Sequence, residues 1–360
     1  MNYYALLVAL VLVTALLLRG NQQGNKKFVI VGCFLLFVIY GFRDTYVIGD
    51  DSTNTYVGGF LATGKMSWSE LMNLDIQNKG YFVFNKIIYG VTGGDYQAYI
   101  TILSGLVTFC FGFLVYRYSP DPLQSILYHL GILLFTFHFS ALKQSAAMAI
   151  LMLAFDQIFR KRPVLFYLLV VLAGTFHFPA LVFLPAYLIS KIHLGKYYIL
   201  FVFALLAIVY LFRSQILSFM IGLYRDDEVE VHLANVQFLR TKALIMIIIV
   251  VSGFFFRFPQ KDDSCYETLL IFMGIAIVFQ TYCGYNNIYE RLADYYFQFS
   301  VIYIPMVFDR NAKREALFQW RTMEVVESIA PYLFCGLGIY RFLTYVVSDS
   351  TLYPYRFFFQ

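Results

Sequence analysis

The sequence predicts an all-α polytopic integral membrane protein with about twelve transmembrane helices. Of its 360 residues, 60% are hydrophobic and only 14% are charged, whereas soluble domains carry about 25% charged residues. The hydrophobic residues form long runs, and the basic residues gather between these runs. A globular core of this size cannot bury so much apolar surface, so lipid must be the solvent for much of the chain. This composition excludes a soluble enzyme.

Each apolar run is predicted to be a helix, because backbone polar groups cannot be left without hydrogen bonds in lipid. The first run lacks the basic start and the small-residue cleavage site of a signal peptide, so we expect it to be retained. Several runs are shorter than the roughly 20 residues that a bilayer requires, and those around His177 are therefore expected to be short, tilted or broken. The predicted helices are 3–18, 28–42, 96–116, 123–139, 144–159, 163–176, 178–190, 197–212, 241–257, 267–283, 292–308 and 325–346.

The basic residues between the runs predict the orientation of the chain, because Lys and Arg in short loops stay in the cytoplasm. When the predicted helices are counted alternately, four basic groups fall on one side of the membrane. These groups lie at 19–27, 160–162, 191–196 and 310–321. That side is predicted to be cytoplasmic, and both termini are then external.

The chain is accordingly predicted to form a single transmembrane domain, 1–360, with two long external loops, 43–95 and 213–240. The first loop contains an apolar stretch at 81–91 that is too short to span a bilayer. A full crossing there would also reverse every later helix. We therefore expect an interfacial or re-entrant helix.

Cysteine usage and charge exclude several classes of site. The five cysteines are scattered and form no CxxC pair, so neither a disulfide framework nor a metal site is expected. The net charge of +5 is spread over short loops, which gives no patch for nucleic acid. No nucleotide-binding loop is recognisable on the cytoplasmic side, so a nucleotide-sugar donor is not expected.

A dense polar segment follows the second predicted helix, from Arg43 to Tyr56. Gly49 permits a tight turn there, and Asp51 belongs to a run of acidic and hydroxyl side chains. The ordinary structural alternative is a helix-capping turn. Ionisable groups are scarce in the rest of this chain, and their density here favours a functional segment.

Lys143 and Gln144 open the predicted helix 144–159 from the outer side. A cation at a helix N-terminus opposes the helix dipole, but it suits a bound phosphate, to which the free N–H groups also donate. The structural alternative is a lysine whose charged end simply reaches the membrane surface.

His177 and Arg291 lie at two further outer helix ends. His177 falls between two short runs, where Pro179 ends the helix, and a histidine can take a proton from a sugar hydroxyl near neutral pH. A purely structural histidine is the alternative, as we expect for His138. Arg291 offers a planar fork for phosphate, and the alternative is a simple pair with Glu290.

These residues resemble the motifs of the EpsG-like, Wzy-type polysaccharide polymerases of bacteria. The resemblance covers nearly the whole chain in the expected order. One departure is Lys143, which stands where the family usually has Arg and so loses the bidentate geometry. The matching residues are Arg43, Gly49, Asp51, Ser52 and Tyr56; Gly80, Tyr81, Phe82 and Asn85; Lys143, Gln144, Ala146 and Ala147; Arg160 to Arg162; Phe176 to Leu181; Arg291 with Tyr295 or Tyr296; and Pro354 to Phe357.

The resemblance implies metal-independent glycosyl transfer without a cofactor. Such enzymes join undecaprenyl-diphosphate-linked oligosaccharide repeat units at the outer leaflet of the bacterial cytoplasmic membrane, so the active site faces the periplasm or the cell exterior. The product is an O-antigen, capsule or exopolysaccharide, and a chain-length regulator is a further partner that the resemblance allows.

The resemblance also implies roles for individual residues. Arg43, Lys143 and Arg291 are expected to hold the diphosphate. His177 or Asp51 is expected to activate the acceptor, with a slight preference for His177. The glycan is expected to contact Gln144, Tyr56, Tyr295 and Arg356.

Two other functions stay open. A repeat-unit flippase would place charges at mid-membrane depth and show internal repeats, and neither is visible in this sequence. A glycan ligase to lipid A core, or a membrane acyltransferase, would also work at the outer leaflet. A ligase would share the donor chemistry, so only the identity of the acceptor separates it from a polymerase.

Overall fold

The computed structural model describes residues 2–20, 22–49, 55–223, 236–257, 263–284, 286, 288–309 and 321–360. Within these ranges the chain forms helices and no strand, apart from one isolated antiparallel bridge between Arg43 and Phe357. The predicted all-α class is therefore confirmed for this part of the chain.

Among the described residues, six helices are long and apolar enough to cross a membrane. They support a polytopic membrane protein, whereas the count of about twelve spans stays a prediction. The six segments are Gln22–Gly41, Tyr96–Tyr118, Leu142–Phe159, Gly195–Phe219, Ser264–Thr281 and Ser328–Ser348.

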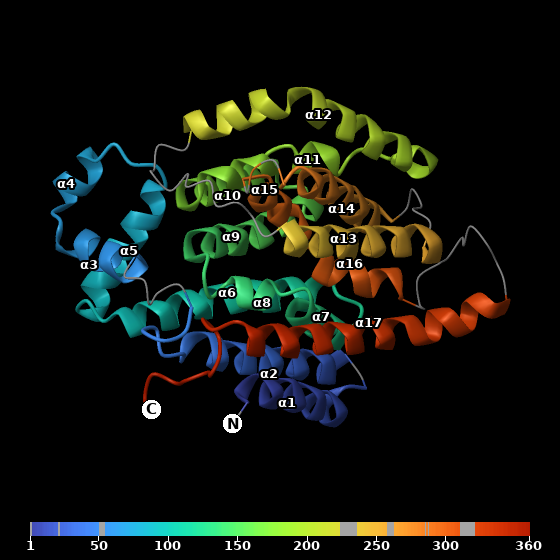
Figure 1. Ribbon diagram of the computed structural model, residues 1–360, viewed down its shortest axis with the longest axis horizontal. Coiled ribbons are helices and arrows are strands. Elements are labelled where there is room, and N and C mark those ends of the chain that lie inside the picture. The colour runs from blue at the N-terminus through green and yellow to red at the C-terminus, as the bar shows by residue number, and fades with distance from the viewer. Residues whose placement is uncertain are drawn as a thin grey trace.

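The helices lie roughly side by side in a stack (Figure 1). Helices α1 (Tyr3–Leu18) and α2 (Gln22–Gly41) form one edge, and α12 (Tyr198–Leu223) forms the opposite edge. Three short helices, which we call the arm, lie together beyond one end of the stack. The arm consists of α3 (Thr55–Lys65), α4 (Trp68–Asn73) and α5 (Lys79–Thr92).

The arm marks one end of the stack, here called the arm end. Helices α2, α10 and α17 finish toward it, and α6 and α9 begin there (Figure 1). The connections α1–α2, α9–α10 and α11–α12 lie at the opposite end. Three of the four basic groups belong to these connections and so lie at the same end of the stack, while their cytoplasmic location stays a prediction. The fourth group, at 310–321, lies almost wholly outside the described residues.

Several helices have the bounds that the sequence predicts. Helices α1 and α10 (Pro163–Phe176) have the same bounds as the predicted helices. Four further helices differ from their predicted bounds by a few residues at one or both ends. Caps fix some of these ends: the Asp95 carboxylate accepts the backbone N–H groups of Gln97 and Ala98 at the start of α6. The four further helices are α6 (Tyr96–Tyr118), α9 (Leu142–Phe159), α14 (Ser264–Thr281) and α17 (Arg321–Ser348).

Three predicted helices are broken in the structure. The first divides into α7 (Pro122–Gly131) and α8 (Leu134–Phe137) at Leu133, whose φ of 65° lies in the left-handed region and ends the helical ladder. The second divides into the 3₁₀ helix η2 (Phe178–Phe183) and α11 (Ala186–Ile189). This outcome confirms the expected break near His177. The third divides into α15 (Ile288–Phe297) and α16 (Ser300–Val307).

The two predicted loops hold more helix than the apolar runs alone indicate. Helix α12 continues to Leu223, and α13 (Val236–Phe256) begins before residue 240. The predicted helix at 81–91 is confirmed as part of α5, while its placement at the membrane surface stays a prediction. A short 3₁₀ helix, η3 (Gly195–Tyr197), precedes α12.

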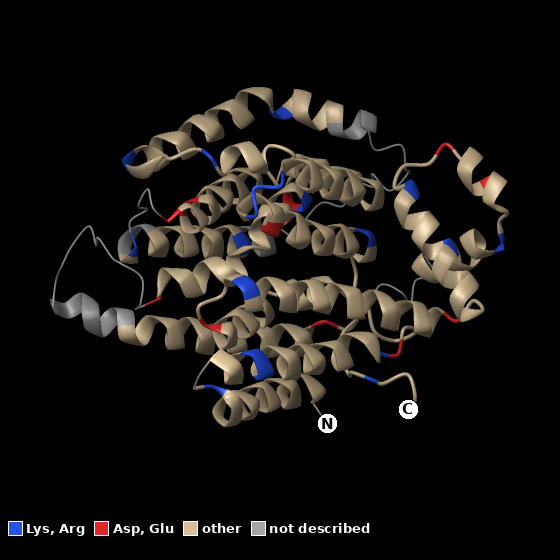
Figure 2. Cartoon of the chain, turned by 180° about the vertical axis from the view of Figure 1, so that it is seen from behind, with Lys and Arg blue, Asp and Glu red and all other residues tan. Residues whose placement is uncertain are grey.

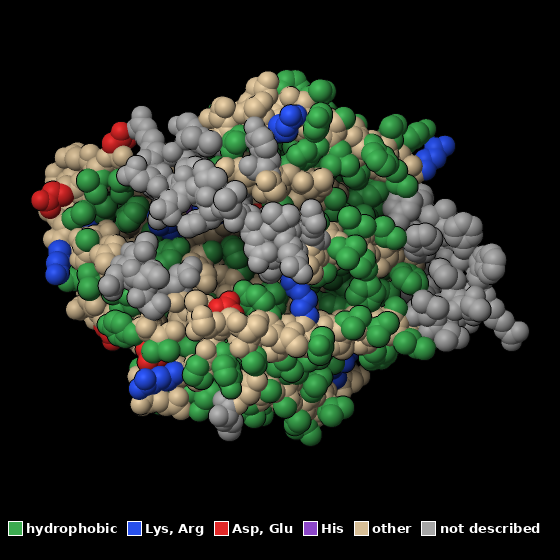
Figure 3. All heavy atoms as spheres, viewed as in Figure 1, with side chains coloured by type: hydrophobic (Ala, Val, Ile, Leu, Met, Phe, Trp, Pro, Cys, Tyr) green, Lys and Arg blue, Asp and Glu red, His purple; other side chains and the backbone are tan. Residues whose placement is uncertain are grey.

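The outer surface of the stack is strongly apolar. Hydrophobic side chains cover much of the face in Figure 3, and the long helices carry few charged residues in Figure 2. On α12, Leu200, Phe203 and Leu211 expose 66%, 65% and 66% of their surfaces. Such exposure is unfavourable in water and favourable in lipid, which agrees with a membrane protein.

Candidate functional site

His177 lies at the arm end, between α10 and η2. Its side chain is buried, and its Nδ1 is hydrogen-bonded to the hydroxyl of Tyr295 on α15. The next residue, Phe178, donates its backbone N–H to the Asn78 side chain at 2.9 Å, at the start of α5. The break in the α10–η2 segment is therefore held by both α5 and α15.

Gly80 allows α5 to approach α10 closely. A Cβ atom at this position would lie 2.1 Å from the Thr175 Oγ1 and 2.7 Å from the Thr175 Cβ. No larger residue fits without moving one of the two helices. This glycine belongs to the family pattern quoted above, and it brings the start of the arm helix next to His177.

Lys143 and Gln144 come from the first turn of α9. The Lys143 Nζ lies 5.4 Å from the ring centroid of Phe82 and 5.9 Å from that of Tyr81, both on α5. The Gln144 Nε2 donates to the backbone carbonyl of Arg291 at 3.3 Å. The starts of α5, α9 and α15 therefore meet, although the sequence separates them widely.

Lys143, His177 and Arg291 form one electrostatic group, which we call the cationic triad after its two cations, Lys143 and Arg291. Burial holds the pKa of His177 well below its usual range, and the positive charges of Arg291 and Lys143 lower this pKa further. The imidazole is therefore neutral at physiological pH, which is the form that a general base requires. Three residues predicted for the site thus converge.

Arg43 belongs to a second group, built with the C-terminal tail. Its guanidinium is buried, donates to the Tyr40 carbonyl at 2.8 Å and lies about 5 Å from the Tyr40 and Phe139 rings. Its backbone pairs with Phe357 in the isolated bridge. The Arg356 Nε lies 3.6 Å from the Asp44 carboxylate. The first and last motifs of the chain therefore meet, whereas the expected diphosphate role of Arg43 stays a prediction.

The remaining predicted residues of the polar segment are less informative. Asp51 lies outside the described residues. Tyr56 is half-buried on α3, where it packs against the core. Gly49 has a φ of 88° and donates its N–H to the Thr351 carbonyl at 2.8 Å, so it adopts the left-handed backbone that glycine permits and is joined to the tail.

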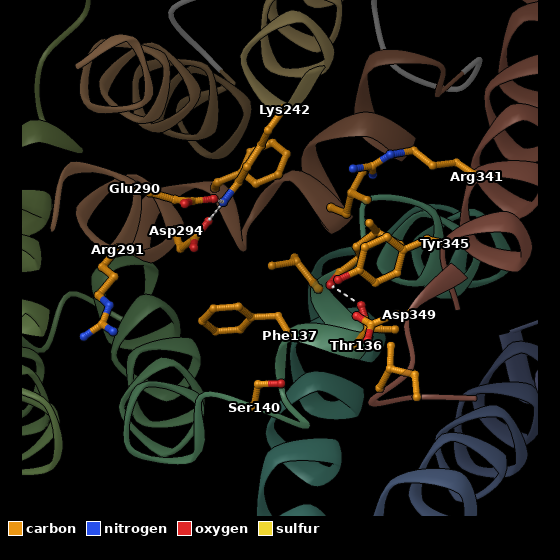
Figure 4. Close-up of a pocket in the computed structure, with 15 residues that line it drawn as sticks. Thr136, Phe137, Ser140, Lys242, Glu290, Arg291, Asp294, Arg341, Tyr345 and Asp349 are labelled. Carbon is orange, nitrogen blue, oxygen red and sulfur yellow. Dashed lines mark hydrogen bonds and ion pairs between the residues drawn. The ribbon is translucent and has the colours of Figure 1, made fainter. Parts of the chain in front are cut away.

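A cavity of about 340 Å³ lies beside the cationic triad. Arg291 borders it, so this residue belongs to both (Figure 4). The walls come from the α7–α8 break, α13, α15, α17 and the tail. The lining residues are Ile132, Leu133, Leu134, Thr136, Phe137, Ser140, Lys242, Glu290, Arg291, Asp294, Phe297, Arg341, Tyr345, Asp349 and Leu352.

An ion-paired group that the sequence analysis missed lines this cavity. The Lys242 Nζ lies 2.8 Å from a Glu290 oxygen and 2.7 Å from an Asp294 oxygen (Figure 4). Glu290 therefore pairs with Lys242, a partner that the sequence analysis did not consider. One signal was available: carboxylates four residues apart share a helix face and repel each other unless a cation lies between them.

Arg341 joins the cavity wall to the α7–α8 break. Its Nη1 donates to the Gly131 carbonyl at 2.8 Å, where α7 ends. Carbonyls at a helix C-terminus lack partners within the helix and carry partial negative charge. The break is thus stabilised by a cation from α17, and the sequence analysis did not identify this residue.

The arrangement provides three chemical capabilities. Lys143 and Arg291 can neutralise an anion, the hydrogen-bonded His177 can accept a proton, and the adjacent cavity can hold a polar molecule. Within the described ranges, no three His, Cys, Asp or Glu side chains lie close enough together to hold a metal ion.

Comparison with known proteins gives one match. The model of a family described as the EpsG family matches residues 26–357, which is most of the chain. No curated protein and no solved structure matches this chain.

Proposed function

The chain belongs to the EpsG family, and from this membership we propose that it is a polysaccharide polymerase of the outer leaflet. It joins undecaprenyl-diphosphate-linked oligosaccharide repeat units into an O-antigen, capsule or exopolysaccharide. The protein lies in the bacterial cytoplasmic membrane with about twelve spans, and its site faces the periplasm or the cell exterior. The arm and the end of α12 lie on that side.

One observation carries the proposal: Lys143, His177 and Arg291 converge from three separate segments. The anomeric carbon of the donor loses its bond to a diphosphate oxygen and gains a bond to an acceptor hydroxyl oxygen. The leaving diphosphate carries negative charge, which Lys143 and Arg291 stabilise where it develops. Both electrons of the broken bond leave with the diphosphate, so this step requires no oxidant or reductant.

His177 accepts the proton of the acceptor hydroxyl as the new bond forms. For this step the Nδ1 N–H donates to the Tyr295 hydroxyl oxygen, so the lone pair of Nε2 takes the proton. Tyr295 fixes the orientation and tautomer of the ring. Asp51 stays an alternative base, and Arg43 stays an additional diphosphate ligand in this proposal.

Complementation in cells tests the function. The gene is deleted and restored as wild type, Arg43→Ala, His177→Ala or Arg291→Ala, with membrane levels matched by immunoblot. Lys65→Ala, an exposed residue on α3, is the control. The surface glycan is then resolved on a gel.

A polymerase predicts that deletion leaves single repeat units, and that the control restores the ladder while His177→Ala and Arg291→Ala do not. Failure of Arg43→Ala alone would add this residue to the site. Deletion that abolishes even the single surface unit would instead indicate a flippase or a ligase. A normal ladder from His177→Ala would remove His177 from the mechanism.

A further inference from the structure

The cavity beside the cationic triad has the size and lining of a small-molecule site. Ligand sites are concave, hold about 300–1,000 Å³ and combine apolar walls with a few placed polar groups. This cavity of about 340 Å³ lies near the lower limit. It therefore suits a short saccharide segment rather than a long glycan or a polyprenyl chain.

The charges in the cavity wall balance one another. Three cations and three carboxylates line it, namely Lys242, Arg291 and Arg341 with Glu290, Asp294 and Asp349. Lys242 is held between two of the carboxylates, and Arg341 donates to the carbonyl that ends α7. The wall therefore offers many hydrogen-bonding atoms but no net charge. An anionic ligand would gain little here and would face buried carboxylates.

The rest of the lining suits the faces of a sugar ring. Phe137, Phe297 and Tyr345 present aromatic rings, and Thr136 and Ser140 add hydroxyls. Aromatic rings pack against the apolar faces of a ligand, while carboxylates accept hydrogen bonds from hydroxyl groups. A sugar presents both features: C–H groups on its faces and hydroxyls around its edge.

We propose that this cavity is the acceptor subsite and that it binds the uncharged non-reducing end of a repeat unit. This inference rests on the proposed function, because the proposed reaction is what makes the bound sugar an acceptor. Arg291 joins the cavity to the diphosphate-binding cations. The donor diphosphate lies at Lys143 and Arg291, and the acceptor sugar lies on the other side of Arg291. Glu290 and Asp294 bind its hydroxyls while Lys242 holds both carboxylates in place.

Binding experiments with two separate probes test the assignment. The first probe is the oligosaccharide that mild acid releases from the lipid-linked pool of wild-type membranes. The second is farnesyl diphosphate, which carries the diphosphate without a sugar. Each is titrated calorimetrically into full-length protein in nanodiscs.

A matched pair of variants isolates the cavity. Ser140→Trp fills it, whereas Ser140→Ala at the same position leaves it open. Glu290→Gln is a second cavity variant that keeps the side-chain volume, and Lys143→Ala is the reciprocal variant for the diphosphate.

We expect Ser140→Trp and Glu290→Gln to weaken oligosaccharide binding about tenfold or more, equivalent to about 1.4 kcal/mol. Ser140→Ala, which removes one hydroxyl and keeps the cavity open, loses less affinity for the oligosaccharide than Ser140→Trp does. Lys65→Ala on exposed α3 keeps wild-type affinity, and farnesyl diphosphate affinity stays unchanged in all four variants. Lys143→Ala weakens farnesyl diphosphate binding and leaves the oligosaccharide affinity unchanged.

Oligosaccharide binding that is unchanged in both cavity variants would overturn the assignment. An acidic sugar at the non-reducing end of the released unit, found by mass spectrometry, would also overturn it. A ladder that survives gene deletion would refute polymerisation while leaving the saccharide-binding result valid, so the two failures are distinguishable.

Discussion

Removing the cation from the Lys242 group should destabilise the protein strongly. Lys242 exposes 14% of its side chain and Asp294 only 2%, and the ion pairs measure 2.7 and 2.8 Å. Lys242→Met leaves Glu290 and Asp294 close together without the cation that forms an ion pair with each of them. Breaking a buried pair by removing one partner costs about 3–5 kcal/mol, whereas an exposed pair contributes about 0–1 kcal/mol.

The matched variant replaces all three charges. Because a whole buried ion-pair group can be replaced by neutral residues at little cost, Lys242→Met/Glu290→Gln/Asp294→Asn should recover most of the stability. Lys65→Met on exposed α3 controls for the loss of a lysine. The assay is thermal denaturation in detergent, in which unfolding is measured as the loss of the monomer fraction in size-exclusion chromatography.

For this reasoning to hold, the triple variant must unfold at a higher temperature than Lys242→Met. A single variant that unfolds at the wild-type temperature would show that solvent screens the Lys242 group. A triple variant as unstable as the single one would show that packing, rather than charge, causes the loss.

Three further predictions concern the site itself. Lys143→Ala should lower kcat/KM for polymer formation about 10- to 150-fold, because one charged hydrogen bond of about 1.5–3 kcal/mol is lost. Lys143→Arg should retain most of the activity. Equal rates for Lys143→Ala and the wild type would remove this cation from the site. Because its pKa lies well below 6.5, His177 should stay neutral as the pH falls through 6.5, so a pH–rate profile of the wild type should show no loss there. A drop in rate centred at 6.5 would contradict the burial of the ring. The unfolded chain does take up this proton below 6.5, so stability should fall in acid. Gly80→Ala should cost about 1–3 kcal/mol by overpacking against α10, measured by thermal denaturation, whereas Gly90→Ala, which meets nothing within 4 Å, should not; equal stability would show that α5 can shift freely.

Much of the fold could be predicted because apolar runs in lipid have one stable backbone conformation. The bounds of α1 and α10 follow directly from where the apolar run begins and ends. The break at His177 was predictable as well, because Pro179 interrupts the hydrogen-bond ladder. The break at Leu133 was not, because it lies inside a continuous apolar run, and the cation that contacts the end of α7 there, Arg341, comes from α17.

The candidate site was predicted in part, for a comparable reason. Lys143, His177 and Arg291 stand out in the sequence because each is a polar residue at the end of an apolar run. Lys242 lies at the end of a run too, but nothing local assigns its partners, which are 48 and 52 residues away.

By itself, the sequence determined the class of protein, the positions of most helices and the set of polar residues at their ends. These properties depend on local composition, because lipid forces the backbone to satisfy its own hydrogen bonds. Only the tertiary structure decided which helix ends meet. His177 and Tyr295 are 118 residues apart, and Gln144 and Arg291 are 147 apart. Such pairings, and the cavity that they border, depend on how helices pack, through close approaches such as that of Gly131 to Gly338, and no local pattern encodes them.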